Sequence, residues 1–264
     1  MDEPVEEIDG PPGAGVLFLC DHASNALPQR YGSLGLAPSQ FERHIAYDIG
    51  AADLTRALAA RFGAPALLTR FSRLLIDPNR GADDPTLVMR LSDGAIIPGN
   101  AEIGPDEIEE RRRLFWQPYR DAVRARLDAM LAAGPVPAII SLHSFTPVWK
   151  GVPRPWEASV LWDADPRLPE PLLAGLRARG IPTGDNEPYD GALEGDTLFE
   201  HGAARGLPHA LIELRQDLIA RPEGVAHWAG VLEEVLRPVL AREGAHMIHH
   251  HASRTARRNR GRNP

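Results

Sequence analysis

The chain has 264 residues, a length that fits one large α/β domain or two small ones. Hydrophobic residues make up 43% of it and charged residues 25%, as in an ordinary globular protein. The net charge of −7 argues against a nucleic-acid partner, and no apolar run approaches the roughly 20 residues of a membrane span. A single cysteine excludes an internal disulfide. We expect a cytoplasmic protein without a nucleic-acid or membrane partner.

The two ends of the chain differ in composition from its body. Residues 1–15 are acidic, end in Pro-Pro-Gly and lack the features of a signal peptide, which predicts a flexible leader. Residues 246–264 are basic and have little to bury, which predicts a disordered tail. Residues 16–245 should then form the folded domain.

The first apolar run, Val16 to Cys20, predicts a strand that is buried on both faces. Asp21, His22 and Asn25 follow it within a short polar turn. Ligands of open α/β sheets bind at the carboxyl ends of the strands, so His22 is expected at a functional edge. The alternative is a polar turn whose Asp and Asn cap the next segment.

Pro38 predicts the first turn of a helix that runs to about Arg61. His44 and Asp48 lie four residues apart on it and therefore share one face. This spacing fits either a surface ion pair or two groups that point into a cleft.

Residues 66–69 predict a second strand, and a short apolar run at 74–76 lies in the segment that carries Arg73 and Arg80. Residues 82–104 are rich in Gly, Pro and Asp and predict a long, partly ordered excursion.

The rest of the chain alternates between strands and helices. Strands are expected at 138–142, 158–162 and 210–214, and helices at 105–133, 169–179, 197–205 and 223–242. This alternation predicts a single α/β domain with a mixed or mostly parallel central sheet and helices on both faces.

Two of these strands carry chemically active side chains. His143 leaves the strand 138–142, and Glu213 interrupts the apolar run 210–214. A carboxylate in such a run is costly unless a cation, a metal or hydrogen bonds partner it.

Two imidazoles, one carboxylate and an open water position form the usual ligand set of a catalytic zinc, and a further carboxylate can act as its base. The chain supplies such groups. It has no HExxH, Walker loop, GxGxxG after the first strand or GxSxG elbow, which argues against zincins, nucleotide hydrolases, dehydrogenases and ordinary serine hydrolases.

Seven motifs in order resemble the N-formylglutamate amidohydrolase family: CDHASNALP, HIAYDIGA, FSRLLIDPNR, SLHSFTP, RPW, GDNEPY and IELRQDL. The similarity runs from about Val16 to Trp228. It implies a zinc-peptidase-like α/β fold related to the zinc carboxypeptidases. It also implies hydrolysis of N-formyl-L-glutamate to formate and L-glutamate, at the end of one histidine-degradation route.

The resemblance implies one zinc ion per chain, with His22 and His143 as its imidazole ligands. Asp48 is implied as the third ligand, with His44 as the competitor. Glu213 is implied as the general base that takes a proton from the water.

Arginines are expected to bind the substrate, because guanidinium groups bind carboxylates in a bidentate fork. The candidates are Arg73, Arg80 and Arg154, and an arginine such as Arg154 could instead stabilise the oxyanion. Arg215 could bind substrate or pair with the carboxylate in its own strand. Asn25 is a further candidate for substrate binding.

The sequence departs from the histidine-pathway members in two motifs, with DHASN in place of a PHSG-like turn and HSFTP in place of an HS-Ile-Arg-like one. Both face the substrate in this interpretation, so they bear on the substrate more than on the metal. We expect a small acylated amino acid, most simply N-formyl-L-glutamate or a related acidic compound. The alternatives are a non-catalytic carboxylate-binding protein and a metallohydrolase of peptide or peptidoglycan amides. A homo-oligomer is compatible with each.

Overall fold

The structure is a computed structural model that describes residues 3–255. Its strands are β1 (Val5–Ile8), β2 (Val16–Cys20), β3 (Ala66–Thr69), β4 (Leu91–Ser92), β5 (Ala95–Ile96), β6 (Ala138–Phe145), β7 (Val148–Trp149), β8 (Val152–Pro153), β9 (Ala158–Leu161), β10 (Thr183–Asp185) and β11 (His209–Arg215). Its α-helices are α1 (Ala51–Phe62), α2 (Pro98–Ala101), α3 (Pro105–Arg111), α4 (Gln117–Ala133), α5 (Pro169–Arg177), α6 (Thr197–His201), α7 (Gln216–Ile219) and α8 (Pro222–Leu240).

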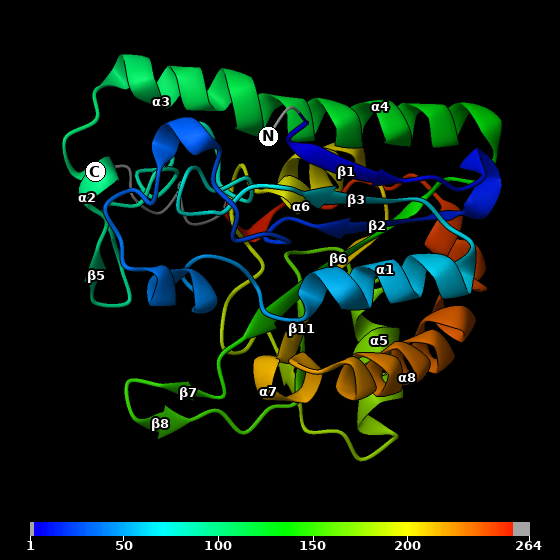
Figure 1. Cartoon of the computed structure of the whole chain (residues 1–264). Coiled ribbons are helices and arrows are strands. Elements are labelled where there is room, and N and C mark those ends of the chain that lie inside the picture. The colour runs from blue at the N-terminus through cyan, green and yellow to red at the C-terminus, as the bar shows by residue number, and fades with distance from the viewer. Residues whose placement is uncertain (1–2, 256–264) are drawn as a thin grey trace, which may run out of the picture.

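A seven-stranded sheet in the order β1-β3-β2-β6-β11-β9-β10 forms the centre of the molecule. The four strands β3, β2, β6 and β11 are parallel, whereas β1 and β9 run antiparallel to their inner neighbours. The prediction of an α/β domain with a mixed, mostly parallel sheet is confirmed. The sheet and its helices form three layers, with α3 and α4 on one face of the sheet and α1, α5 and α8 on the other (Figure 1).

Side-chain alternation along the strands decides where a site can form. On the α4 face, β2 presents Leu17 and Leu19 to the apolar core and then reaches Asp21. Strand β6 presents Ile139 to the same core and then reaches Ser141 and His143. Polar residues therefore replace apolar ones toward the carboxyl ends of these strands.

Residues 38–61 do not form the one helix that the sequence predicted. A 3-10 turn covers Pro38–Glu42, turns follow, and α1 begins only at Ala51. Gly50 breaks the helix because its φ is 80° and because a Cβ there would lie 2.2 Å from the carbonyl oxygen of Ile219. Residues 44 and 48 thus belong to turns and do not share a helical face.

The segment at the start of the chain is not a loose leader throughout. Residues 5–8 form β1, which pairs antiparallel with β3, and Glu6 accepts two hydrogen bonds from Arg56. Val5 and Ile8 lie on opposite faces of β1 and pack against the two cores on either side of the sheet.

The predicted disordered tail is also ordered in the part that the structure describes, residues 246–255. The backbone amide of His249 donates to Gly206, and the guanidinium of Arg254 contacts Asp163 and Asp190. The remaining residues, 256–264, lie outside the described residues. The folded unit therefore extends beyond the expected 16–245 at both ends.

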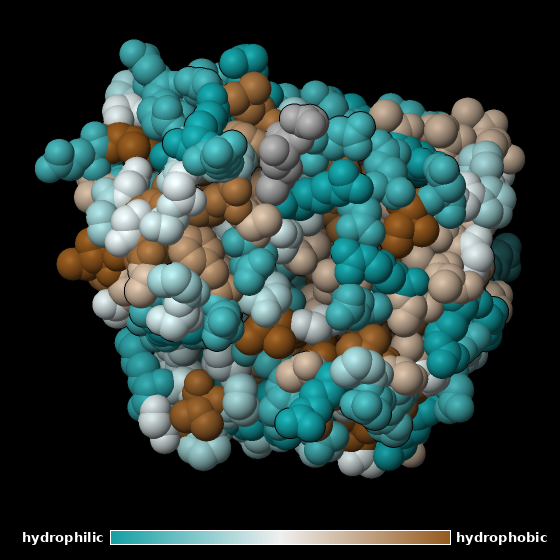
Figure 2. Space-filling model, viewed as in Figure 1, coloured by the Kyte–Doolittle hydropathy of each residue, from teal (hydrophilic) through white to brown (hydrophobic). Residues whose placement is uncertain are grey.

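The excursion 82–104 is partly ordered, since it contains the β4–β5 hairpin and α2, and residues 74–76 before it form a buried turn. This hairpin and the β7–β8 hairpin expose aliphatic side chains, which appear as hydrophobic spots on the left side of Figure 2. None of the described helices has the length and the apolar character needed to cross a membrane.

Arg120 ties α4 to two loops on the same side of the sheet. Its buried guanidinium donates to the carbonyls of Pro78, Arg80 and Gly195, and it pairs with Glu200. One side chain thus satisfies acceptors from segments more than 100 residues apart.

We predict that Arg120→Ala lowers the free energy of unfolding by about 3 kcal/mol, because it leaves buried carbonyls without a donor. Arg124→Ala is the matched control. Arg124 is exposed and pairs with Asp121 and Glu200, so its loss should cost about 0–1 kcal/mol. Urea unfolding of both variants measures the difference, and equal losses would contradict the role given to Arg120.

Candidate metal centre

His22, Asp48 and His143 form a buried group whose ligand atoms all lie within 4.8 Å of one another. The Nδ1 atom of His143 lies 2.8 Å from Oδ2 of Asp48, and Nδ1 of His22 lies 3.4 Å from the same oxygen. In the part of the chain that the structure describes, this is the one group of three or more His, Cys, Asp or Glu residues with such spacing.

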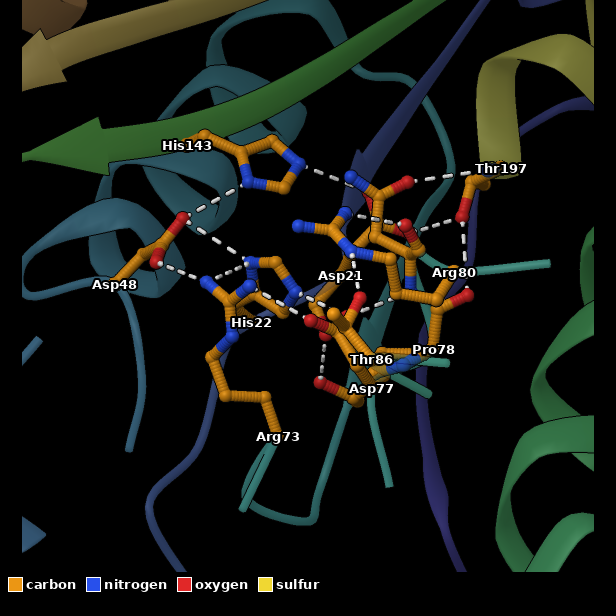
Figure 3. A network of polar contacts seen from close by, with 12 residues as sticks. Asp21, His22, Asp48, Arg73, Asp77, Pro78, Arg80, Thr86, His143 and Thr197 are labelled. Atoms are coloured by element: carbon orange, nitrogen blue, oxygen red, sulfur yellow. Dashed lines mark hydrogen bonds and ion pairs between the residues drawn. The ribbon is translucent and has the colours of Figure 1, made fainter. Parts of the chain in front are cut away.

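Three segments bring these side chains together (Figure 3). His22 lies in the turn after β2, His143 lies in β6, and Asp48 lies in the turns before α1. The Asp48 amide donates to the carbonyl of His22 at 2.9 Å, and the Ser144 amide donates to Oδ2 of Asp48 at 3.2 Å. The backbone therefore fixes Asp48 between the two imidazoles.

Each histidine has a second carboxylate on its other ring nitrogen. Nε2 of His22 lies 2.7 Å from Oδ1 of Asp77, and Nε2 of His143 lies 3.0 Å from Oδ2 of Asp21. An Nε2–H that donates to a carboxylate leaves Nδ1 as the free lone pair. Carboxylates in this position orient the imidazole ligands of metal ions and raise their basicity.

The close contacts of His143 with Asp21 and Asp48 shift the pKa values of all three groups. Burial alone would lower the pKa of His143, but its hydrogen bonds to Asp21 and Asp48 outweigh burial and raise the pKa to about 10. Burial would raise the pKa of Asp21, but the hydrogen bond from His143 brings it down to about 2. Likewise, the two histidines hold the pKa of Asp48 below its usual range against the effect of burial.

A divalent cation fits these residues. When both histidines are neutral with Nε2–H, two Nδ1 lone pairs and a carboxylate oxygen face one another, and a positive charge between them removes the repulsion. Two imidazole nitrogens and one carboxylate oxygen are also a donor set of catalytic zinc sites. His22, Asp48 and His143 would hold such an ion.

Glu213 lies beside this group on the neighbouring strand. It pairs with His143 in the parallel register of β11 and β6, where strands lie about 4.8 Å apart. Its Oε2 is buried and has no hydrogen-bond partner among the described residues. Burial raises the pKa of Glu213 to about 7. The side chain is therefore a carboxylate with a free oxygen and a proton affinity suited to exchange near neutral pH.

These residues line one cavity of about 290 Å³. Arg73 lies in its wall, 3.2 Å from Nδ1 of His22 through Nη1, and is paired with Asp77 at 2.6 Å. Arg80 also lines the cavity and donates to Thr86 and to the carbonyl of Asn79. Within the described residues Arg80 has no ion pair.

Arg154 lies behind the cavity wall and not beside the two histidines. Its guanidinium donates to Thr146 and to the hydroxyl of Tyr189, both of which line the cavity. It is 8% exposed and has no carboxylate partner among the described residues. The structure therefore gives no support for a catalytic contact by Arg154.

Two of the expected substrate-binding residues lie away from the cavity. Arg215 pairs with Asp217 at 2.8 Å, which corrects both roles considered for it. Asn25 donates to the carbonyl of Phe41 at 2.8 Å and so holds its own loop. Neither side chain lines the cavity among the described residues.

His44 lines the cavity but does not join the candidate ligands. Its Nε2 lies 3.6 Å from Asp93, and its ring packs edge-on against Trp149 at the mouth. Asp48, not His44, is the residue that the structure places between the two histidines.

Sequence reasoning missed the carboxylates that hold the histidines. Asp21 directly precedes His22 but contacts His143, and it also accepts hydrogen bonds from Ser141 and Thr197. Asp77 accepts from His22 and belongs to the IDPN turn. The one available signal was the presence of buried acidic residues directly after strand-like runs.

We predict that Asp21→Asn weakens zinc binding by about 10- to 100-fold, because an amide NH₂ cannot accept the hydrogen bonds that this carboxylate accepts. The control is Asp185→Asn, since Asp185 is exposed and accepts from Trp162 at a distance from the cavity wall. Competition with a chromophoric chelator gives both zinc dissociation constants. Equal affinities in the two variants would contradict an orienting role for Asp21.

Proteins of known structure share this fold. A gene product from Agrobacterium tumefaciens of known structure is 35% identical, with a TM-score of 0.85 over 90% of this chain and 95% of that one. The N-formylglutamate amidohydrolase from Ralstonia eutropha shares the fold, with 22% identity and a TM-score of 0.63 over 89% and 97% of the two chains. Among proteins with curated functions, none matches. The family model described as N-formylglutamate amidohydrolase matches residues 14–220, and the chain therefore belongs to that family.

Proposed function

We propose that this protein is a zinc-dependent amidohydrolase that cleaves a small N-acyl amino acid with an acidic side chain, such as N-formyl-L-glutamate. The observation that carries the proposal is the juxtaposition of His22, Asp48 and His143 with Glu213 in one cavity. A cytoplasmic location and a step of histidine degradation belong to the same proposal.

A zinc ion held by the three candidate ligands would supply a Lewis acid that polarises the amide carbonyl and lowers the pKa of the attacking water. Glu213 would take the proton from that water, because its free Oε2 faces no competing donor in the described residues. It would then deliver the proton to the amide nitrogen, so that formate and the free amino acid leave.

Arg73 is the cation closest to the reacting groups. Its Nη1 lies 3.2 Å from Nδ1 of His22 and 3.7 Å from Oδ1 of Asp48, and its ion pair with Asp77 fixes it there. We propose that it stabilises the negative charge that develops on the carbonyl oxygen, in place of the carboxylate-binding role expected from the sequence.

The carboxylates of the amino-acid half would bind Arg80. This guanidinium lines the cavity, is anchored through Thr86 and Asn79, and has no ion pair in the described chain. Arg154 adds positive charge behind the wall and orients the hydroxyl of Tyr189. An acidic substrate is thus matched in charge by two arginines without carboxylate partners.

We predict that Glu213→Gln lowers kcat/KM for N-formyl-L-glutamate by at least 100-fold without loss of bound zinc. Formate release and elemental analysis measure the two quantities in one sample. The wild-type rate should fall as pH drops, because protonation removes the base. The midpoint of this fall should lie below about pH 7, because burial raises the pKa of Glu213 to about 7 and a bound cation lowers it again. Full activity in the variant would contradict the role of Glu213.

We predict that Arg80→Gln raises KM for N-formyl-L-glutamate by about 10- to 100-fold with a smaller change in kcat, because a charge-assisted contact to substrate is lost. Arg215→Gln is the matched control, since Arg215 is paired with Asp217 outside the cavity. Steady-state kinetics of both variants tests the assignment. An increase in KM for Arg215→Gln alone would reverse it.

A further inference from the structure

The cavity wall next to Glu213 is apolar. Leu211 precedes Glu213 by two residues on β11 and therefore lies on the same face of the sheet. Leu161 at the end of β9 pairs with Leu211 in register. Leu193, from the loop before α6, completes a patch of three leucines that line the main cavity. We call Leu161, Leu193 and Leu211 the leucine patch.

The spacing brings this patch within reach of a bound amide. Two residues along a strand are about 6.8 Å apart, so Leu211 lies a few bond lengths from the level of Glu213 and His143. A substituent of two to four carbons on an amide held at that level would reach the patch. A formyl group, which ends in a hydrogen atom, would not.

A smaller cavity of about 20 Å³ lies next to the main one and is lined by the same three leucines. Leu198 and Phe199 also line it, and no arginine or lysine lines it among the described residues. Two carboxylic side chains, Asp163 and Asp196, do line it. An anionic group would therefore lose its hydration there between apolar walls, with no lining arginine or lysine to pair with it.

We propose that the leucine patch is a subsite for an apolar N-acyl group larger than formyl. The inference rests on the proposed function, because the acidic amino-acid half is taken up by Arg80 and leaves the acyl half for the patch. The substrates of this protein are then N-acyl amino acids with a short aliphatic acyl chain. The smaller cavity has room for about one further small group, which limits the length of that chain.

Binding to the zinc-loaded Glu213→Gln variant tests the subsite without turnover. Calorimetry with N-formyl-, N-acetyl-, N-propionyl- and N-butyryl-L-glutamate should show affinity rising about fourfold for each added carbon until the patch is filled. N-succinyl-L-glutamate is the matched probe, because it has the length of the butyryl compound and a carboxylate at the end. It should bind more weakly than N-butyryl-L-glutamate.

Substitutions in the patch locate the effect. Leu193→Ala, in the same Glu213→Gln background, should lower the affinity for the propionyl compound by about tenfold. It should change the affinity for the formyl compound less. Leu193 is half-buried in a loop, so its loss should not prevent folding. Leu240→Ala, at the half-buried end of α8, is the matched control and should keep the full gain.

Equal affinity for all four acyl compounds, or tighter binding of the succinyl compound, would overturn the subsite. A gain that survives Leu193→Ala and Leu211→Ala would also overturn it. These outcomes differ from a failure of the proposed function, which would appear as absent hydrolysis of every acyl compound by the zinc-loaded wild-type protein.

Discussion

The site depends on the placement of one carboxylate between two imidazoles whose Nε2 atoms already contact other carboxylates. Asp77 and Asp21 fix the outer nitrogens of His22 and His143, so that both Nδ1 atoms turn toward Asp48. Nδ1 lone pairs directed at a carboxylate repel it unless a proton, a guanidinium or a metal ion lies between them, and Arg73 lies 3.2 Å from Nδ1 of His22. This buried group has the residues and spacing that could hold a metal ion, and the same cavity is lined by Arg73 and Glu213.

The fold supplies that arrangement through strand alternation. The same face of β6 carries Ile139 into the core against α4 and His143 into the cavity. On β11 the change from apolar Leu211 to polar Glu213 comes one pair farther along, since Leu211 pairs with Ser141 and Glu213 with His143. The hydrophobic core and the site are successive stretches of one sheet face, and the pairing of β6 with β11 sets the distance between His143 and Glu213.

Strand patterns made much of this predictable. The buried run Val16–Cys20, the histidines that follow strand-like segments and the unusual Glu213 all pointed to one edge of a mixed sheet, and the structure brings these groups together. The expected pair of His44 and Asp48 on one helical face was wrong. Local spacing could not show that Gly50 lies close to the backbone of Ile219 and that the helix begins only after it.

Long-range partners were beyond the reach of the sequence. Asp21 directly precedes one histidine and serves the other, 122 residues away, because β2 and β6 are neighbours in the sheet. The arginines show the same limit. The sequence makes Arg215 and Arg80 equal candidates for substrate binding. The structure distinguishes them, because Arg215 pairs with Asp217 whereas Arg80 lines the cavity.

The central claim is that a metal ion at the His22–Asp48–His143 group is required for amide hydrolysis. The most direct measurement is the metal content of the purified protein, followed by acylglutamate hydrolysis before chelation, after chelation and after zinc is returned. We expect about one zinc ion per chain, and activity that disappears on chelation and returns with zinc. Hydrolysis that continues at full rate in metal-free protein would contradict the proposed metal dependence.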